Sequence, residues 1–333
     1  MTHVPEERPA STTGGLDTPD RTDGLVYVMS EEIEFAVEVA LATGRPLLLS
    51  GAPGSGKSSL APRVARLRNW RYYEHVVTYR TQPRDLLWSF DSVRRLGDAQ
   101  VPRPDGPVRE DADYVQPGVL WWALAPRSAR RRGRPPGRYD GEGWPDPFRE
   151  INEGRDPDCA VVLIDEIDKA EPDVPNSLLV PLGSHRFIVA ETGAVISTEP
   201  ARRPEVTDRA RHLIVITTNE ERELPQAFKR RCVDLTLSEH GEDLLVRIAL
   251  AHLAQWPGGL GSGDEELAAT IAHELMKVRA QALADGVRSP STAEYLDAVR
   301  ACRALAIRPG SAQWRRLVPL LLVKRQQATG GLV

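Results

Sequence analysis

The sequence predicts an α/β protein in which a parallel sheet with helices on both faces is followed by a smaller all-α domain. Up to about residue 238, short apolar runs typical of buried strands alternate with segments of helical periodicity. Beyond that point only helical periodicity remains. The length of 333 residues fits two domains. A glycine-rich segment between the first strand and the next helix indicates what the sheet binds.

The glycine-rich segment, residues 51–58, reads GAPGSGKS and fits the pattern G-x-x-x-x-G-K-[ST]. It directly follows the apolar run at residues 47–49 and precedes a helix-forming stretch. Such a loop turns backbone N–H groups toward phosphates, Lys57 reaches the β- and γ-phosphate oxygens, and the Ser58 hydroxyl holds Mg²⁺. The residues expected to contact a bound nucleotide are Gly51, Ala52, Pro53, Gly54, Ser55, Gly56, Lys57, Ser58 and Ser59.

Composition excludes several classes of protein. A net charge of −4 with 27% charged residues does not point to nucleic acid or to a membrane surface. The cysteines Cys159, Cys232 and Cys302 are odd in number and far apart, which argues against a disulfide framework and against a zinc site. No apolar run approaches the roughly 18 residues of a membrane span, and the first residues do not resemble a signal peptide. A cytoplasmic protein with no membrane contact is expected.

The first domain is expected to begin after a tail. Residues 1–23 hold almost no aliphatic side chains, which predicts disorder. A helix at 31–41 with Ser30 as N-cap, a strand, a helix to about residue 67 and a strand at 72–79 follow. Two segments interrupt the alternation, residues 82–125 and 126–158. The second is rich in proline and arginine and predicts an exposed loop.

The insert at residues 82–158 contains two features with alternative interpretations. The arginines between Arg130 and Arg138 suit a solvated face, or else contact with a partner or nucleic acid. Trp121 and Trp122 suit core or interface packing better than stacking on bases.

Strands at residues 160–164 and 213–217, a helix at 174–182 and a hairpin at about 185–198 complete the α/β domain, expected to span residues 24–238. Helices at 244–256, 265–283, 292–307 and 314–326 form the all-α domain, residues 239–328. In such a sheet the ligand lies at the carboxyl ends of the strands.

Polar residues stand at those carboxyl ends. Asp165 and Glu166 follow a buried strand, where adjacent carboxylates are costly unless a cation or substrate is bound. We expect Asp165 to support Mg²⁺, and Glu166 to orient and deprotonate the attacking water. The alternative is an exposed Asp-Glu turn, which the phosphate loop upstream disfavours. Asn219 ends the next strand, near the γ-phosphate, although Asn is also a common turn residue.

Arg230 and Arg231 end a short predicted helix. A guanidinium stabilises charge spread over phosphoryl oxygens, so one of them is a candidate to act in trans on a neighbouring subunit's site. A surface salt bridge is the alternative for each.

The order of these motifs resembles an AAA+ ATPase of the MoxR type. The phosphate loop, residues 164–168 (IDEID), Thr218-Asn219 and residues 228–232 (FKRRC) carry the resemblance, which covers about residues 25–325. The insert is similar to the helix-2 insert of that clade, and the hairpin to its pre-sensor-1 hairpin. The resemblance implies ATP and Mg²⁺ as cofactors, a homo-oligomeric ring, usually a hexamer, and a client such as a von Willebrand A domain protein.

Two points depart from that pattern or stay open. Arg288 precedes Ser-Pro, whereas many MoxR relatives carry the sensor-2 arginine just after Ser-Pro, where Ser291 stands here. Arg288 is the candidate γ-phosphate contact. ATP rather than GTP follows from the resemblance alone.

The expected function is Mg²⁺-dependent ATP hydrolysis coupled to remodelling of a partner protein. The alternatives are a slow signalling or defence switch and a nucleic-acid-associated NTPase, although nucleic acid is not the expected partner.

Overall fold

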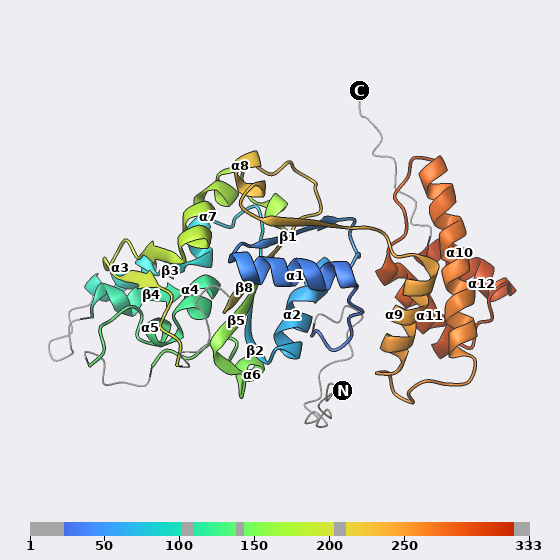
Figure 1. The fold of residues 1–333 in the computed structure, drawn as a ribbon, viewed down its shortest axis with the longest axis horizontal. Coiled ribbons are helices and arrows are strands. Elements are labelled where there is room, and N and C mark those ends of the chain that lie inside the picture. Colours follow the sequence, from blue (N-terminus) through green and yellow to red (C-terminus); the bar gives the residue numbers. More distant parts are fainter. Residues whose placement is uncertain (1–22, 101–108, 138–142, 203–210, 323–333) are drawn as a thin grey trace.

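Five parallel strands form the central sheet of the computed structural model, which describes residues 23–100, 109–137, 143–202 and 211–322 (Figure 1). The strand order is β2-β5-β8-β1-β9. Every neighbouring pair in it is parallel. The bounds are Leu47–Gly51 for β1, Trp70–Val76 for β2, Asp156–Asp165 for β5, His212–Thr217 for β8 and Val233–Leu237 for β9. The predicted parallel sheet is confirmed.

Helices cover both faces of the sheet, because successive strand side chains point to opposite sides. Leu47 and Leu49 face helices α1 (Glu31–Thr43) and α2 (Lys57–Leu67), in one apolar cluster. Leu48 faces the other cluster, which contains residues of α4 (Val119–Leu124), α7 (Asp173–Ser184) and α8 (Gln226–Lys229). The fold class predicted from the sequence is therefore correct.

Two element boundaries illustrate the local chemistry. The Ser30 hydroxyl accepts a hydrogen bond from the Ile33 N–H, and this is the predicted N-cap of α1. Strand β2 begins and ends earlier than the predicted 72–79. After Val76 the chain turns, with the Thr81 N–H donating to the Thr78 carbonyl at 3.0 Å.

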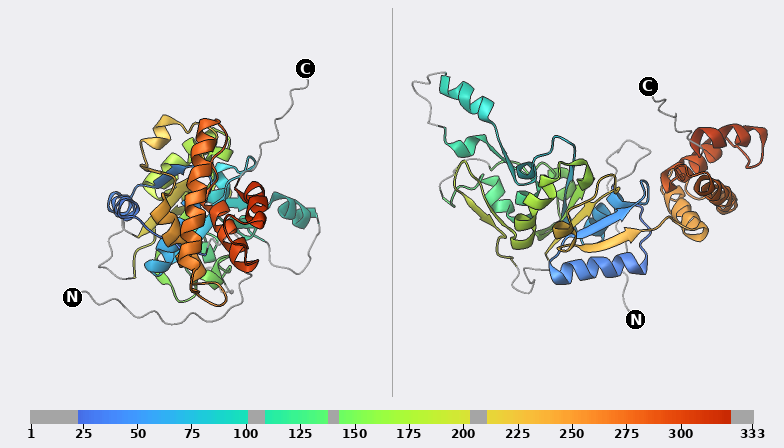
Figure 2. Two further views of the ribbon diagram at one scale, coloured as in Figure 1. Left: turned by 90° about the vertical axis from the view of Figure 1, so that its right-hand side faces the viewer. Right: turned by 90° about the horizontal axis from the view of Figure 1, so that it is seen from above.

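The first part of the insert projects away from the sheet (Figure 2). Strands β3 (Trp88–Phe90) and β4 (Val115–Pro117) pair antiparallel and carry helix α3 (Ser92–Gln100) at their far end. None of the α3 residues is buried. The short helices η1 (Pro83–Leu86) and η2 (Asp111–Tyr114) flank this unit.

Most described residues in the second part of the insert are exposed or half-buried, as its composition predicts, but the side chains of two arginines are not. It contains the short helices α5 (Pro126–Arg130) and α6 (Arg149–Asn152). Arg132 is buried, its guanidinium 3.9 Å from the centre of the Trp144 ring, and Arg134 forms ion pairs with Glu110 and Asp113. These arginines are buried because the insert itself supplies an aromatic face and carboxylates. Arg138 lies outside the described residues.

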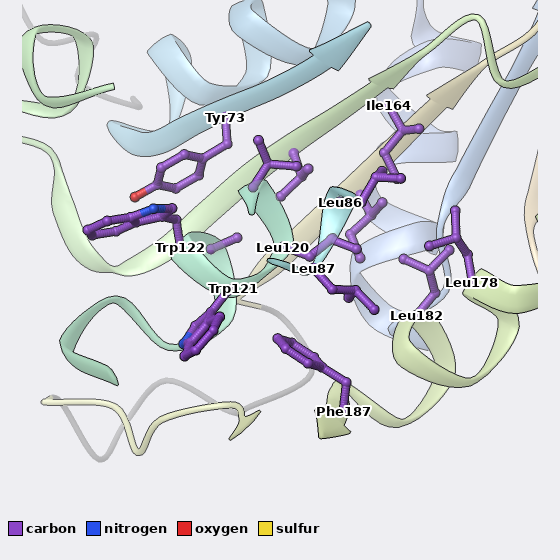
Figure 3. Close-up of a cluster of buried hydrophobic side chains, with 14 of the residues drawn as sticks. Tyr73, Leu86, Leu87, Leu120, Trp121, Trp122, Ile164, Leu178, Leu182 and Phe187 are labelled. Atoms are coloured by element: carbon purple, nitrogen blue, oxygen red, sulfur yellow. The ribbon is translucent and has the colours of Figure 1, made fainter. Parts of the chain in front are cut away.

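The tryptophans of α4 belong to the core, as the sequence favours (Figure 3). Trp121 and Trp122 are both buried. The hairpin is formed by β6 (Arg186–Ile188) and β7 (Val195–Ser197). Its Phe187 ring lies 5.7 Å from the ring of Trp88 and 5.8 Å from that of Trp121, so aromatic packing fixes the hairpin to the insert.

Helices after β9 form a separate cluster at one end of the molecule, opposite the projecting α3 (Figures 1 and 2). Their bounds are Glu242–Leu253 for α9, Asp264–Ala284 for α10, Thr292–Ala304 for α11 and Ala312–Leu321 for α12. They share their own apolar core, and we call them the lid. The predicted tail up to residue 22 and the predicted helical residues 323–326 lie outside the described residues. No helix in the described ranges combines the length and apolar character needed to cross a membrane.

The aromatic stack predicts that two Phe→Ala substitutions lower the free energy of unfolding by unequal amounts. Phe187 is 7% exposed and Phe35 is 71% exposed. We expect Phe187→Ala to lower the free energy of unfolding by about 3 to 5 kcal/mol, because it leaves a cavity between two tryptophans. Phe35→Ala should change it by less than about 0.5 kcal/mol. Denaturant unfolding followed by tryptophan fluorescence measures both, and equal losses would contradict the packing described here.

Candidate functional site

The largest group of predicted site residues meets in one cavity, between the carboxyl ends of the strands and the lid. Its volume is about 330 Å³. The α/β domain contributes the phosphate loop, defined as residues 51–58, and polar residues after β5 and β8. The lid contributes α9, α11 and the segment before α9. Figure 1 shows the lid beside this end of the sheet.

Glycines give the phosphate loop its shape. Gly51, Gly54 and Gly56 have φ angles of 137°, 78° and 88°, which side chains disfavour. A Cβ atom on Gly51 would lie 2.5 Å from the Leu237 carbonyl oxygen, and one on Gly54 would lie 2.6 Å from the Ser291 Cβ. The loop therefore packs closely on β9 and on the lid.

Lys57 and Ser55 give this loop the character of an anion site. Lys57 is only 6% exposed, and its Nζ donates to the Gly51 and Ala52 carbonyls at 2.7 and 2.9 Å. Burial lowers the pKa of Lys57, while nearby carboxylates, Asp165 first among them, oppose that shift. The Ser55 hydroxyl is buried without a hydrogen-bond partner among the described residues. A buried cation beside an unused hydroxyl suits the oxygens of a phosphate.

Asp165 connects the phosphate loop to the neighbouring strand. Its Oδ1 accepts a hydrogen bond from the Ser58 hydroxyl at 2.8 Å and one from the Thr217 hydroxyl at 2.5 Å. Strand pairing brings these residues together, since β5 lies beside β8, and β8 beside β1. Hydroxyl and carboxylate oxygens are ligands that Mg²⁺ prefers, so this pair fits the metal expected with a nucleotide.

Glu166 adopts a left-handed backbone, with φ of 59°, directly after β5. Its N–H donates to the Thr217 hydroxyl at 2.8 Å. Its carboxylate accepts hydrogen bonds from the Asn219 side-chain amide at 3.2 Å and from Lys169 at 2.6 Å. That hydrogen bond raises the pKa of Lys169. A non-glycine residue in this conformation costs about 1 to 3 kcal/mol and here turns a carboxylate toward the cavity.

Asp168 fixes the loop that carries Asn219. It is 2% exposed, and its Oδ2 accepts the N–H groups of Asn219 and Glu221 at 3.1 and 2.9 Å. Sequence reasoning assigned no role to Asp168, Lys169 or Thr217. The strand register that pairs Leu49 with Thr217 would have indicated the threonine.

The opposite wall of the cavity is largely apolar and aromatic. Val26 and Tyr27 line it, together with Ile248 and Leu296 of the lid. His240 also lines the cavity, with its Nδ1 2.9 Å from the Thr292 hydroxyl. Burial lowers the pKa of His240, which keeps the ring neutral, and burial raises the pKa of Tyr27. This wall suits a planar, uncharged ring.

Six predicted site residues do not line this cavity, namely three arginines and the loop residues Gly51, Ala52 and Ser55. Arg288 lines a neighbouring hollow beside the phosphate loop, and its guanidinium pairs with Glu294 at 3.3 Å. Arg230 and Arg231 follow α8 and are both exposed. The Arg230 carbonyl accepts a hydrogen bond from Arg45 at 3.4 Å, and Arg231 lines a hollow with Arg45.

Comparison with known proteins agrees with this arrangement. The sequence profile of the AAA domain family (dynein-related subfamily) matches residues 46–232. No curated protein matches the chain at a significant level. Among solved structures, one of a "putative ATPase" from Cytophaga hutchinsonii is 13% identical, covers 90% of this chain and 83% of its own, and superposes with a TM-score of 0.41. The superposition is too loose to carry an argument.

The matched segment contains the phosphate loop, β5 with its two carboxylates and the strand leading to Asn219, and it makes up more than half of the sequence. This chain belongs to the AAA domain family, in its dynein-related subfamily.

Proposed function

We propose that the protein is a Mg²⁺-dependent ATPase that acts as a MoxR-like ring, for which a hexamer is the size we expect, and remodels a partner protein. The observation that carries the hydrolytic part is the continuous set of contacts from Ser58 through Asp165 and Thr217 to Glu166 and Asn219. These residues line one cavity together with Lys57.

Each side chain has a separate role in this proposal. Lys57 neutralises the β- and γ-phosphates, and the loop N–H groups orient them. Ser58 and Asp165 would hold Mg²⁺, which neutralises charge on the phosphoryl oxygens when bound. The Glu166 carboxylate accepts a proton from the attacking water, and the Asn219 amide orients that water against the γ-phosphate.

The arginines after α8 support action in trans. Arg230 and Arg231 are exposed, and neither lines the cavity of its own chain. Neither forms an ion pair with a carboxylate of the described ranges. An exposed guanidinium without a partner is available to a neighbouring subunit's γ-phosphate. Arg288 is not included in the catalytic set, because Glu294 already pairs with it.

Features outside the cavity favour a partner protein over nucleic acid. The projecting α3 exposes Val93 and Leu96, and the hairpin exposes Ile188 and Val195. Apolar side chains on protruding elements suit contact with a protein, of which a von Willebrand A domain protein is one candidate. Arg132 and Arg134 are held by groups of the insert, so they are not free for a phosphate backbone.

Glu166→Gln tests the hydrolytic mechanism. The amide keeps the size of the side chain but cannot accept a proton, so we expect ATP binding near the wild-type level and turnover at least about 100-fold slower. Phosphate release and binding of a fluorescent ATP analogue measure the two quantities. Glu171→Gln, at an exposed position of the same segment, is the matched control and should leave turnover unchanged. Turnover retained in the Glu166 variant would exclude this residue as the base.

Mixing of two inactive variants tests action in trans. A chain with Arg230→Ala and Arg231→Ala keeps its own Glu166 but lacks the guanidinium for its neighbour, and a Glu166→Gln chain has the opposite defect. We expect each alone to be nearly inactive and the mixture to regain part of the activity, because a mixed ring contains sites with both groups.

One outcome of the mixing experiment would contradict action in trans. If the mixture is no more active than its components, and turnover per wild-type subunit does not rise with protein concentration, each site is complete within one chain.

A further inference from the structure

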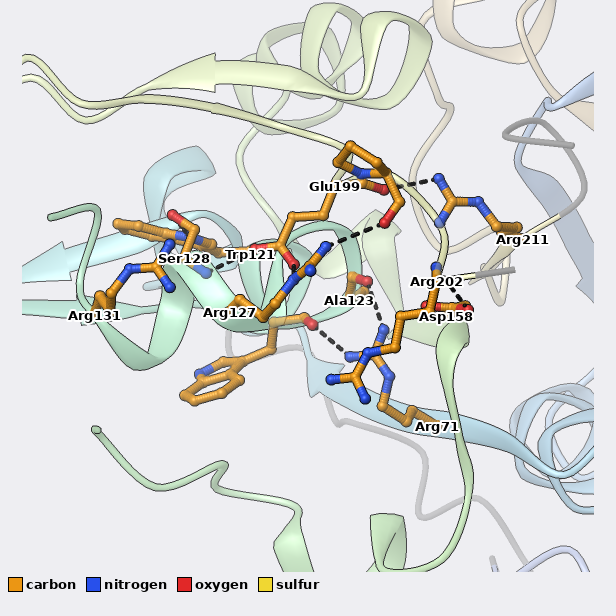
Figure 4. A network of polar contacts seen from close by, with 12 residues as sticks. Arg71, Trp121, Ala123, Arg127, Ser128, Arg131, Asp158, Glu199, Arg202 and Arg211 are labelled. Atoms are coloured by element: carbon orange, nitrogen blue, oxygen red, sulfur yellow. Dashed lines mark hydrogen bonds and ion pairs between the residues drawn. The ribbon is translucent and has the colours of Figure 1, made fainter. Parts of the chain in front are cut away.

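A second, smaller cavity lies at the amino-terminal edge of the sheet, opposite the phosphate loop. Figure 4 shows polar contacts of several residues that line it. Its volume is about 110 Å³, a third of that of the nucleotide cavity. It lies at the starts of β2, β5 and β8, and the segment after β7 closes one side. The charged residues lining it are the arginines Arg71, Arg127, Arg130, Arg202 and Arg211 and the acids Asp146, Asp158 and Glu199.

Arg71 provides a buried positive charge in this cavity. It is 6% exposed and donates to the carbonyls of Trp122 and Ala123 at 2.7 and 3.0 Å, and to the Tyr73 hydroxyl at 2.9 Å. Within the described ranges it forms no ion pair with a carboxylate, and its Nε has no hydrogen-bond partner. The Tyr73 hydroxyl in turn donates to Asp146 at 2.9 Å, so a carboxylate lies one hydrogen bond away from Arg71.

Two further buried residues, Arg211 and His212, line the same cavity. Arg211 is buried and donates to the Glu199 carbonyl at 2.9 Å. Burial, together with His185, Arg211 and Arg71, lowers the pKa of His212 to about 3, so this ring is neutral at physiological pH. The Nδ1 atom of His212 is buried without a hydrogen-bond partner in the part of the chain described.

The acids contact other residues that line the cavity. Glu199 pairs with Arg127 at 2.7 Å, Asp158 accepts the Arg202 N–H at 3.0 Å, and Asp146 accepts the Tyr73 hydroxyl at 2.9 Å. The side chains of Arg130 and Arg202 are exposed and form no ion pair among the described residues. With five arginines against three acids, the lining carries an excess of positive charge.

We propose that this cavity binds a phosphate group, either free inorganic phosphate or the terminal phosphate of a small molecule. The buried fork of Arg71 and the exposed guanidinium groups of Arg130 and Arg202 match the charge and hydrogen-bonding geometry of phosphate oxygens. The volume suits such a group and is too small for a second nucleotide.

A purely structural role accounts for only part of the observations. Arg71 caps carbonyls at the end of α4, which a cation near a helix C-terminus would do without any ligand. That role does not explain why the exposed side chains of Arg130 and Arg202 line the same cavity.

Calorimetric titration of inorganic phosphate tests the proposal. The full chain is first saturated with Mg²⁺ and a non-hydrolysable ATP analogue, which fills the phosphate loop, and ionic strength is held constant with chloride. We expect binding to the wild type, and binding about tenfold weaker or more to the Arg130→Ala/Arg202→Ala variant, since charge-assisted hydrogen bonds are lost. Both side chains are exposed, so this variant should fold, whereas Arg71 substitutions risk the core.

Matched arginines of the lid provide the control. Arg308→Ala/Arg315→Ala removes the same number of exposed charges and should retain wild-type affinity. Glycerol 1-phosphate in place of phosphate separates the sources: binding of both identifies a terminal phosphate, and binding of inorganic phosphate alone identifies the free anion. No phosphate binding by the wild type, or equal affinity in the wild type and the Arg130/Arg202 variant, would falsify the proposal.

Discussion

The nucleotide cavity depends on the hydrogen bonds that two hydroxyl groups donate to one carboxylate oxygen of Asp165. Ser58 belongs to the phosphate loop and Thr217 to the neighbouring strand, so Asp165 fixes the position of the loop relative to the sheet. The Thr217 hydroxyl also accepts the Glu166 N–H. That contact holds the left-handed turn that brings the Glu166 carboxylate beside Asn219. One strand register therefore sets the geometry of the positions proposed for the metal, the base and the γ-phosphate sensor together.

The sequence allowed the fold and much of this site to be predicted, because the information was local. The apolar strands, the glycine pattern and the carboxylates after residue 164 can each be recognised from a few consecutive residues. The contribution of Thr217 could not be recognised in this way, because its contact with Asp165 spans 52 positions and depends on the pairing of β5 with β8. The ion pair of Lys169 with Glu166 likewise depends on a left-handed residue that no local pattern required.

In the second part of the insert, composition predicted the exposure of most residues but not the burial of two arginine side chains. Proline and arginine predict solvent exposure only when nothing nearby can compensate the charge. Trp144 and Asp113 provide that compensation for Arg132 and Arg134, and neither partner is adjacent in sequence. Arg288 lines the hollow beside the phosphate loop, where it pairs with Glu294.

A strand buried on both faces can carry charge only near its ends, where solvent, ligands or ions compensate it. Strand β5 follows this rule, with Asp158 before the apolar residues 159–164 and Asp165 after them. The constraint applies equally to the neighbouring strands, so polar and charged side chains lie at two opposite edges of one sheet. At the carboxyl edge, carboxylates lie around a buried lysine. At the amino edge, arginines lie around a neutral histidine. A buried charge needs compensation at either edge, and at the amino edge the arginines outnumber the carboxylates among the residues that line the cavity.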